Sequence, residues 1–175
     1  METKARILDA AQIAFAEKGY THTNLREIAA QSRVATSLLI KHFGSKTNLF
    51  AEALAKNLRD AEVGSEDRLN FGERLVRVLV DPQIPVLTPA MIALSLEDEE
   101  ARRVAAKVAR QHMILPLAEW LGPPQAESRA ASLLMLSIGF ALFQRHLKAE
   151  ISTQASETSA RRFARLIQEV VDESS

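Results

Sequence analysis

Apolar residues recur at every third or fourth position along nearly the whole chain, and this spacing restricts the possible folds more than any other feature. It places the apolar residues on one side of an α-helix, whereas a half-buried strand requires strict alternation. Alanine, leucine, arginine and glutamate, which favour helices, dominate the sequence, and no segment alternates convincingly. We therefore predict an all-α protein.

The first third of the chain is predicted to contain two short helices joined by a tight turn. Gly19 ends the first helix, because glycine readily adopts the left-handed backbone found at helix C-termini. Thr23 or Asn24 caps the second helix, and only three residues separate that helix from the third. Ser45 caps the fourth helix, whose inward-facing residues include Leu58. These predicted helices cover residues 3–18, 25–32, 36–43 and 46–62.

The remainder of the chain is predicted to form further helices, one of them interrupted by Pro116. The nearly apolar run at residues 130–143 is shorter than the roughly 20 residues that cross a membrane, so we expect a buried helix and no membrane contact. The charged N-terminus lacks the apolar segment of a secretory signal, and we expect a cytoplasmic protein. The predicted helices cover residues 66–80, 89–96, 97–121, 125–147 and 157–172.

Charge is unevenly distributed, although the net charge of the chain is zero. Residues 1–60 carry nine Lys or Arg and six Asp or Glu, a local excess of three positive charges. Within residues 24–48, Glu27 is the single acid, and the basic residues are Arg26, Arg33, Lys41 and Lys46. A basic cluster on so short a segment favours the docking of a polyanion such as DNA.

Motifs for several other functions are missing from the sequence. There is no cysteine, and the four histidines do not have the spacing of metal ligands, so we expect no metal site. A small helical enzyme is the alternative from another class. Since the chain has neither a glycine-rich phosphate loop nor a nucleophile motif, we expect no enzymatic activity and no cofactor.

The two short helices have the pattern of a helix-turn-helix. Leu39 and Phe43 anchor the second of them inward, which leaves its outer face free to enter a major groove. Spacing alone leaves open an ordinary helical hairpin with a solvated polar face. The residues predicted on the outer face or at its exposed start are Thr36, Ser37, Leu38, Lys41 and His42.

Residues 3–55 resemble the DNA-binding domain of the tetracycline-repressor (TetR) family, with the family's spacing throughout. The similar segments are 6–11, 15–20, 23–30, 42–46 and 49–50. The resemblance implies a helix-turn-helix DNA-binding domain at residues 1–47, joined by the fourth helix to a larger helical domain for effector binding and dimerisation at residues 48–175. It also implies a homodimeric repressor that a small-molecule effector releases from a palindromic double-stranded DNA operator.

Individual contacts follow from the same resemblance. Thr23, Lys41, His42 and Lys46 would hold the DNA backbone, and Thr36, Ser37 and Leu38 would face base edges. The chain departs from the family pattern at Arg33, Ala35, Ser37 and Ile40, where the family usually has a turn glycine, a small polar cap, a glycine and a tyrosine. Because of these departures, a helical protein-interaction module that has lost DNA binding is the alternative function.

The second half of the chain supplies the predicted dimer interface and effector pocket. The apolar helix and the last helix would pair with their copies in a four-helix interface, where small residues allow close approach. Its predicted residues are Ser132, Ser137, Gly139, Phe163, Leu166, Ile167 and Val170. Few charges face inward in the middle helices, so we expect a largely apolar effector. The predicted pocket residues, each of which can also be simple core, are Met91, Leu94, His112, Met113, Trp120, Met135, Phe140 and Phe143.

Overall fold

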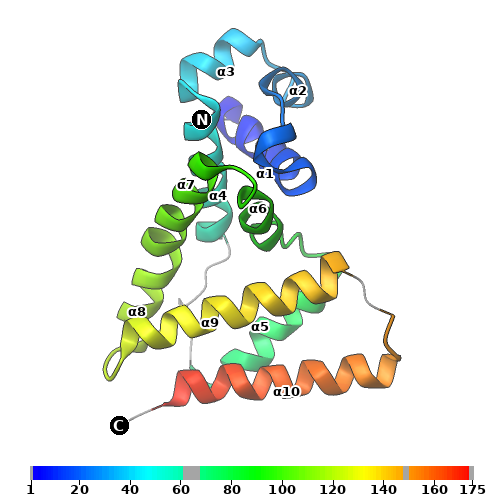
Figure 1. The fold of residues 1–175 in the computed structure, drawn as a ribbon, viewed down its shortest axis with the longest axis vertical. Coiled ribbons are helices and arrows are strands. Elements are labelled where there is room, and N and C mark those ends of the chain that lie inside the picture. Colours follow the sequence, from blue (N-terminus) through cyan, green and yellow to red (C-terminus); the bar gives the residue numbers. More distant parts are fainter. Residues whose placement is uncertain (1, 61–67, 148–149, 174–175) are drawn as a thin grey trace. The chain divides into compact units, whose positions relative to one another are not determined.

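The computed structural model describes residues 2–60, 68–147 and 150–173, with the backbone alone at residues 2 and 57–60. Every regular element in these ranges is helical (Figure 1), which confirms the predicted all-α class. The chain forms two compact units. Unit 1 comprises Met1–Ala61 and Ala90–His112, and unit 2 comprises Glu62–Pro89 and Met113–Ser175. The predicted division into a DNA-binding domain at residues 1–47 and an effector-binding and dimerisation domain at residues 48–175 is one of function, and it stays a prediction.

Unit 1 contains the first four predicted helices, and each is observed within a few residues of its predicted bounds. Ser45 caps the fourth as predicted, since the Asn48 N–H donates to its hydroxyl oxygen at 3.0 Å. Leu58 lies outside the described side chains. The helices of unit 1 are α1 (Glu2–His22), α2 (Leu25–Gln31), α3 (Thr36–Phe43), α4 (Lys46–Asp60), α6 (Thr88–Ser95) and α7 (Glu99–Ala109).

An aromatic cluster holds α1 against α4. Phe15 and Phe50 are fully buried with ring centroids 5.1 Å apart, and Tyr20 packs edge-on to Phe50 at 5.5 Å. Gly19, at φ 72°, breaks the α1 backbone as predicted. A Cβ at Gly19 would lie 3.1 Å from Cβ of Leu94 on α6, so this position requires both the backbone freedom and the small size of glycine.

Unit 2 contains α5 (Phe71–Val80), α8 (Leu115–Leu121), α9 (Ala126–Ala141) and α10 (Thr153–Asp172). The predicted helix at 97–121 consists of three pieces: α7, the π-helical segment η1 (Arg110–Ile114) and α8. Pro116 is the second residue of α8, directly after η1, so the predicted interruption at this proline is observed as a change from π-helical to α-helical hydrogen bonding. The predicted start of the last helix at residue 157 was wrong, because the Ser152 hydroxyl accepts the Ala155 N–H at 3.2 Å and caps α10 four residues earlier.

The helices α5 and α10 make an unusually close crossing at Gly72. A Cβ added there would lie 2.0 Å from the carbonyl oxygen of Ala164 and 3.1 Å from the backbone nitrogen of Gln168. The Gly72 N–H donates to Oε1 of Gln168 at 3.0 Å. The two backbones therefore meet directly, and α9 packs against both α5 and α10 (Figure 1).

Two arginines tie the ends of unit 2 helices to distant segments. Arg129, only 4% exposed, donates to the carbonyls of Val170 at 2.9 Å and Val171 at 2.7 Å, near the C-terminus of α10. Arg145, in the π-helical segment η2 (Leu142–Leu147), donates to the carbonyl of Leu79 at 2.7 Å at the end of α5. Helix C-termini have carbonyls without intrahelical partners, and the arginines satisfy them.

The predicted helix at 125–147 is observed as α9 followed without a break by η2, and this helical stretch, Ala126–Leu147, is longer than the apolar run at 130–143. By length and composition alone it could cross a membrane. It also contributes Ala130, Leu133 and Ala141 to the buried core of unit 2. Core helices of soluble proteins meet the same criterion, so the stretch is weak evidence for a membrane.

Candidate nucleic-acid interface

The turn between α2 and α3 is held by local hydrogen bonds. The Asn24 side chain caps α2 by accepting the Arg26 N–H at 2.9 Å. The backbone N–H of Val34 donates to the Ala29 carbonyl at 2.9 Å and closes the turn. Arg33 has φ 55°, so its backbone adopts the left-handed conformation at the turn position where the TetR family usually has glycine. The helix-turn-helix geometry is thus formed without that glycine.

The recognition helix α3 has a buried face and an exposed one. Leu39 is fully buried and Phe43 is 3% exposed, as the spacing predicted. The outer face carries hydroxyl, imidazole and ammonium groups that can donate to phosphates and base edges. Of the predicted contacts on α3, Ser37, Lys41 and His42 are exposed, and Thr36 and Leu38 are half-buried. Ile40 is 48% exposed on the same helix and offers only apolar contact.

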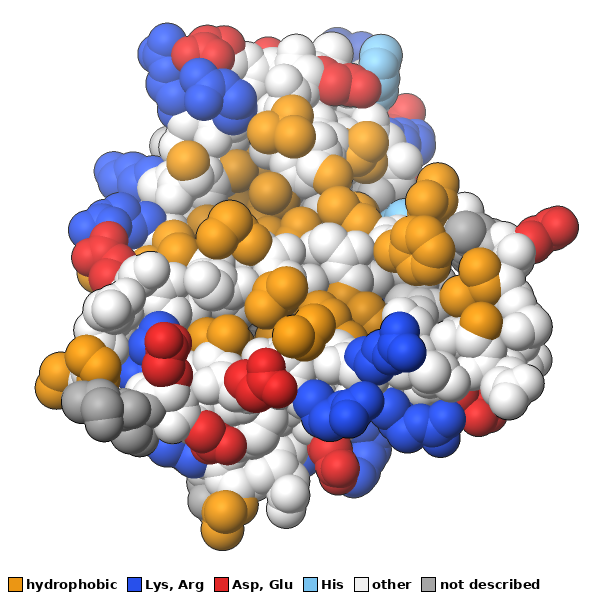
Figure 2. All heavy atoms as spheres, turned by 60° about the horizontal axis from the view of Figure 1, so that its bottom comes forward, with side chains coloured by type: hydrophobic (Ala, Val, Ile, Leu, Met, Phe, Trp, Pro, Cys, Tyr) orange, Lys and Arg blue, Asp and Glu red, His pale blue; other side chains and the backbone are white. Residues whose placement is uncertain are grey.

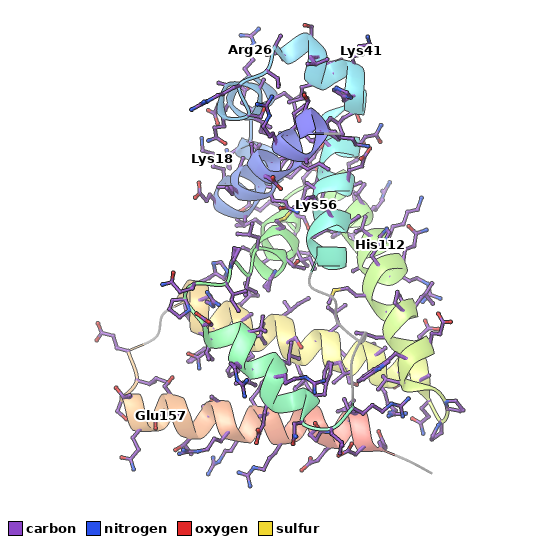
Figure 3. The ribbon with its side chains drawn as sticks, turned by 180° about the vertical axis from the view of Figure 1, so that it is seen from behind. Lys18, Arg26, Lys41, Lys56, His112 and Glu157 are labelled. Atoms are coloured by element: carbon purple, nitrogen blue, oxygen red, sulfur yellow. The ribbon has the colours of Figure 1, made fainter. Side chains whose placement is uncertain are left out.

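The charge on α2 and α3 remains available to a polyanion. Glu27, the single acid of residues 24–48, is neutralised by Lys18, whose Nζ lies 2.6 Å from its carboxylate. Arg26, Arg33 and Lys41 form no ion pair with any residue that the structure describes. Figure 3 shows Arg26 and Lys41 at the outer end of α2 and α3. Arg26 was not among the predicted contacts, although its place just after the Asn24 cap could have indicated it.

Lys46 combines a surface position with a structural role. Its Nζ donates to the Thr21 carbonyl at 3.3 Å and lies 4.6 Å from the centre of the Tyr20 ring. Partial burial lowers the pKa of Lys46 below its usual value, and the negative charge of Asp98 opposes this shift. Lys46 therefore joins the start of α4 to the end of α1. The sequence analysis predicted a DNA contact and missed this second role.

Thr23 does not lie where the predicted backbone contact requires. Its side chain is inside unit 1, with the residue 3% exposed. The hydroxyl donates to the Gly19 carbonyl at 2.6 Å and lies 3.2 Å from the Ala14 carbonyl. The prediction of a phosphate contact was wrong for this residue, because its hydrogen is already donated to α1. The capping role belongs to Asn24.

The predicted dimer residues divide between the core and the surface of unit 2. Phe163 and Ile167 are 9% and 0% exposed and pack in the core, so they have almost no surface to offer a partner. Ser137 lies two residues from Gly139, on a nearly opposite side of α9, and its hydroxyl donates to the Leu133 carbonyl. The interface predictions for Phe163 and Ile167 were therefore wrong, whereas Ser137 is half-exposed and stays a prediction. Ser132, Gly139, Leu166 and Val170 retain exposed or half-exposed surface.

The predicted pocket residues belong to two separately packed units. Met91, Leu94 and His112 lie in unit 1, and Met113, Trp120, Met135, Phe140 and Phe143 lie in unit 2. Within unit 2, Trp120 packs against Phe71, with ring centroids 5.0 Å apart, and Phe140 stacks on Phe163 at 4.1 Å. Met135 is 67% exposed and does not line an interior cavity of its unit. Met135 therefore lies on the exposed face of α9, and its role in a pocket stays a prediction.

Together, the two short helices, the basic groups of α2, α3 and their turn that pair with no described residue, and the second helical unit define a helix-turn-helix regulator. Two family models agree with this class. One, described as bacterial regulatory proteins of the tetR family, matches residues 7–53. The other, the tetracyclin repressor-like C-terminal domain, matches residues 70–171, more than half of the chain. The chain therefore belongs to the TetR family.

Individual relatives support the same assignment. An HTH-type transcriptional repressor of Mycobacterium tuberculosis is 45% identical over 53 residues, which are 30% of this chain and 28% of that protein. The solved structure of a TetR-family regulator from Streptomyces coelicolor is 27% identical, with a TM-score of 0.55, and the match covers 98% of this chain and 96% of that one. The multidrug-binding protein EbrR, solved with ethidium, has a TM-score of 0.66 at 20% identity, covering 98% and 99% of the two chains, and is similar in fold alone.

Proposed function

We propose that this transcriptional regulator is a cytoplasmic, ligand-responsive repressor that binds a palindromic DNA operator as a homodimer. The observation that carries the proposal is the exposed outer face of α3, next to cationic groups that have no counter-ion among the described residues. A basic face on a helix-turn-helix is attracted to the phosphate backbone and brings the helix to the major groove. The named repressors among its relatives support the direction of regulation.

Contacts with DNA divide by chemistry. Lys41, His42 and Arg26 are placed to meet phosphates, and the hydroxyls of Thr36 and Ser37 can donate to or accept from base edges. The half-buried side chain of Leu38 can meet a thymine methyl group. Ile40, 48% exposed, offers only apolar contact, so the hydrogen bond that the family's usual tyrosine would make to a phosphate is lost at this position.

Binding to the DNA that flanks the gene tests this proposal against the interaction module. Lys41→Ala should weaken operator binding and reduce the slope of log K against log salt by about 1, because one phosphate contact is lost. Lys107→Ala is the matched control, since this exposed lysine lies on α7, outside the helix-turn-helix, and its loss should leave the slope unchanged. Lys46→Met keeps the apolar stem of the side chain and removes its ammonium group, so it tests the structural role of Lys46 in joining α4 to α1.

The absence of saturable binding by wild-type protein at low salt would favour the module that has lost DNA binding. If the Lys41 and Lys107 variants lose operator affinity equally, DNA binding depends on total charge alone and not on α3. If Lys41→Ala reduces the slope of log K against log salt and Lys107→Ala does not, the outer face of α3 is the face that docks on DNA.

We propose that the dimer forms through the outer faces of α9 and α10. Ser132, Leu136, Gly139 and Phe143 are spaced by four, three and four residues, which places them on one face of the helix. A Cβ at Gly139 meets no atom within 4 Å in the chain itself, so a partner helix could approach there closely. Next to this face, Leu136 and residues of the α10 C-terminal half, among them Leu166, line a shallow groove of about 610 Å³.

Gly139→Leu tests the interface without disturbing the protomer. Because the site is open in the chain itself, the helix should stay intact, and a dimer that packs on Gly139 should dissociate. Sedimentation equilibrium measures the mass, and Glu119→Leu on an exposed site of α8 is the control. A wild-type protein that sediments as a 19.3 kDa monomer, or a Gly139 variant that keeps the wild-type dimer constant, would refute this interface.

We further propose that the effector is a small, largely apolar molecule. The π-helical segment η1 joins α7 to α8 and the π-helical segment η2 continues α9, and such segments often occur at functional sites. They include three of the predicted pocket residues: His112, Met113 and Phe143. EbrR, which shares this fold, was solved with ethidium. Effector release from DNA should be measured by titrating apolar and charged compounds into the operator complex, and release by highly charged metabolites alone would refute this proposal.

The mechanism follows from the spacing of DNA half-sites. A dimer reads two half-sites about 34 Å apart, one helical turn of DNA. An effector that binds one arrangement of the dimer better than another changes the distance between the two α3 helices. A shift of a few ångströms then prevents both helices from docking together, and the repressor leaves its operator.

A further inference from the structure

A second groove in unit 2 has a different chemistry from the predicted effector pocket. It runs between α5 and α10, has a volume of about 650 Å³ and contains none of the predicted pocket residues. This volume lies within the range of small-molecule sites, roughly 300–1,000 Å³. On α10, its residues Arg161 and Arg165 lie on a different side of the helix from Leu166 and Val170, the residues of the proposed dimer face.

The groove is apolar at its base. Val76 of α5 and Ala164 of α10 are each 7% exposed, and the half-buried Ala160 lies one turn before Ala164. The close crossing at Gly72 allows the two helices to approach here, and the small alanine side chains leave space beside the crossing. An apolar segment of a ligand could therefore be covered by Val76 and the two alanines.

Three arginines line the groove and have no counter-ion in the part of the chain that the structure describes. Arg77 of α5 and Arg161 and Arg165 of α10 form no ion pair with any described residue, and Arg161 reaches only the hydroxyl of Thr158, at 3.4 Å. Arg161 and Arg165 are four residues apart on one helix face, where like charges destabilise each other. Glu73, the acid that lines the same groove, pairs with none of them. Figure 2 shows, on the face that it presents, Lys and Arg side chains gathered beside an apolar area, with Asp and Glu side chains among them.

We propose that this groove binds an anionic amphiphile, a small molecule with a carboxylate or phosphate head and an apolar chain. The guanidinium groups would hold the head by charge-assisted hydrogen bonds, which are stronger than neutral ones. The chain would lie on Val76, Ala160 and Ala164. This site is separate from the apolar effector site and does not depend on DNA binding.

Decanoate is the probe, titrated calorimetrically into the full chain, with decyltrimethylammonium as the cationic counterpart of equal chain length. Decanoate should bind saturably, and the double variant Arg161→Gln with Arg165→Gln should bind about ten-fold more weakly or worse, because two charge-assisted contacts are lost. Arg162→Gln is the matched control: Arg162 is exposed on the same helix and does not line the groove. Thermal melts verify that all variants are folded.

Methyl NMR locates the probe independently of the arginines. Decanoate should shift the signals of Val76, Ala160 and Ala164, which line the groove. Any of three results would overturn the proposal: no saturable binding of decanoate, equal binding by wild type and the double variant, or an equal loss in the Arg162 control. The cationic probe should neither bind in this way nor shift these methyl signals.

Discussion

Replacing Gly72 by alanine should strongly destabilise unit 2, because this position is where α5 and α10 touch through their backbones. The added methyl would lie 2.0 Å from the Ala164 carbonyl oxygen and 3.0 Å from its carbonyl carbon. No side-chain rotation relieves a contact with the backbone. The two helices must therefore separate, which also weakens the bond from the Gly72 N–H to Gln168.

The magnitude follows from three contributions. Overpacking of this kind costs about 1–3 kcal/mol, and a backbone clash belongs at the upper end. Loss of the hydrogen bond to Gln168 adds about 1 kcal/mol. Alanine is a better helix former than glycine and returns about 0.5–1 kcal/mol. The free energy of unfolding should therefore fall by about 3 kcal/mol.

Urea denaturation followed by circular dichroism measures this change at a fixed protein concentration, because dimerisation makes stability depend on concentration. Glu73→Ala is the matched control on the adjacent, exposed position of α5, where a change within about 0.5 kcal/mol is expected. A Gly72→Ala variant as stable as this control would show that the helices do not cross as closely as described, and the argument would fail.

Two further changes test other features of the fold. Arg33→Gly should raise the free energy of unfolding by about 1 kcal/mol, since glycine carries no penalty at φ 55°, and Arg33→Ala should not, because it keeps a Cβ; thermal unfolding separates the two. Arg129→Met should lower stability by at least about 2 kcal/mol, because it leaves carbonyls near the end of α10 without a donor. An Arg129 variant that unfolds like Arg162→Met, an exposed change on α10, would show that this arginine is not needed.

Local features of the sequence were enough to predict most of the helix boundaries. Gly19, Asn24 and Ser45 each act within a few residues, through a left-handed backbone or a side chain that caps the next turn. The same holds for the inward face of α3, because helical spacing alone puts Leu39 beside Phe43. The last helix was predicted to begin too late, because the capping role of Ser152 was not recognised.

Burial, by contrast, depended on segments far apart in the chain. Phe163 and Leu166 are equally apolar in the sequence, yet α10 places the first in the core and the second at the surface. Thr23 carries a hydroxyl that suits DNA, but α1 supplies the carbonyl that takes its hydrogen. Gly72 shows no special pattern, and its importance comes from Ala164 on a helix that follows much later.

Sequence by itself thus determined the all-α class, the helix-turn-helix and its basic outer face, because helix formation and charge are properties of short segments. Tertiary structure alone decided which polar groups remain available to DNA and which apolar faces remain uncovered. These outcomes depend on packing between helices that are distant along the chain, because the neighbouring helix decides which side chains are buried and which remain exposed.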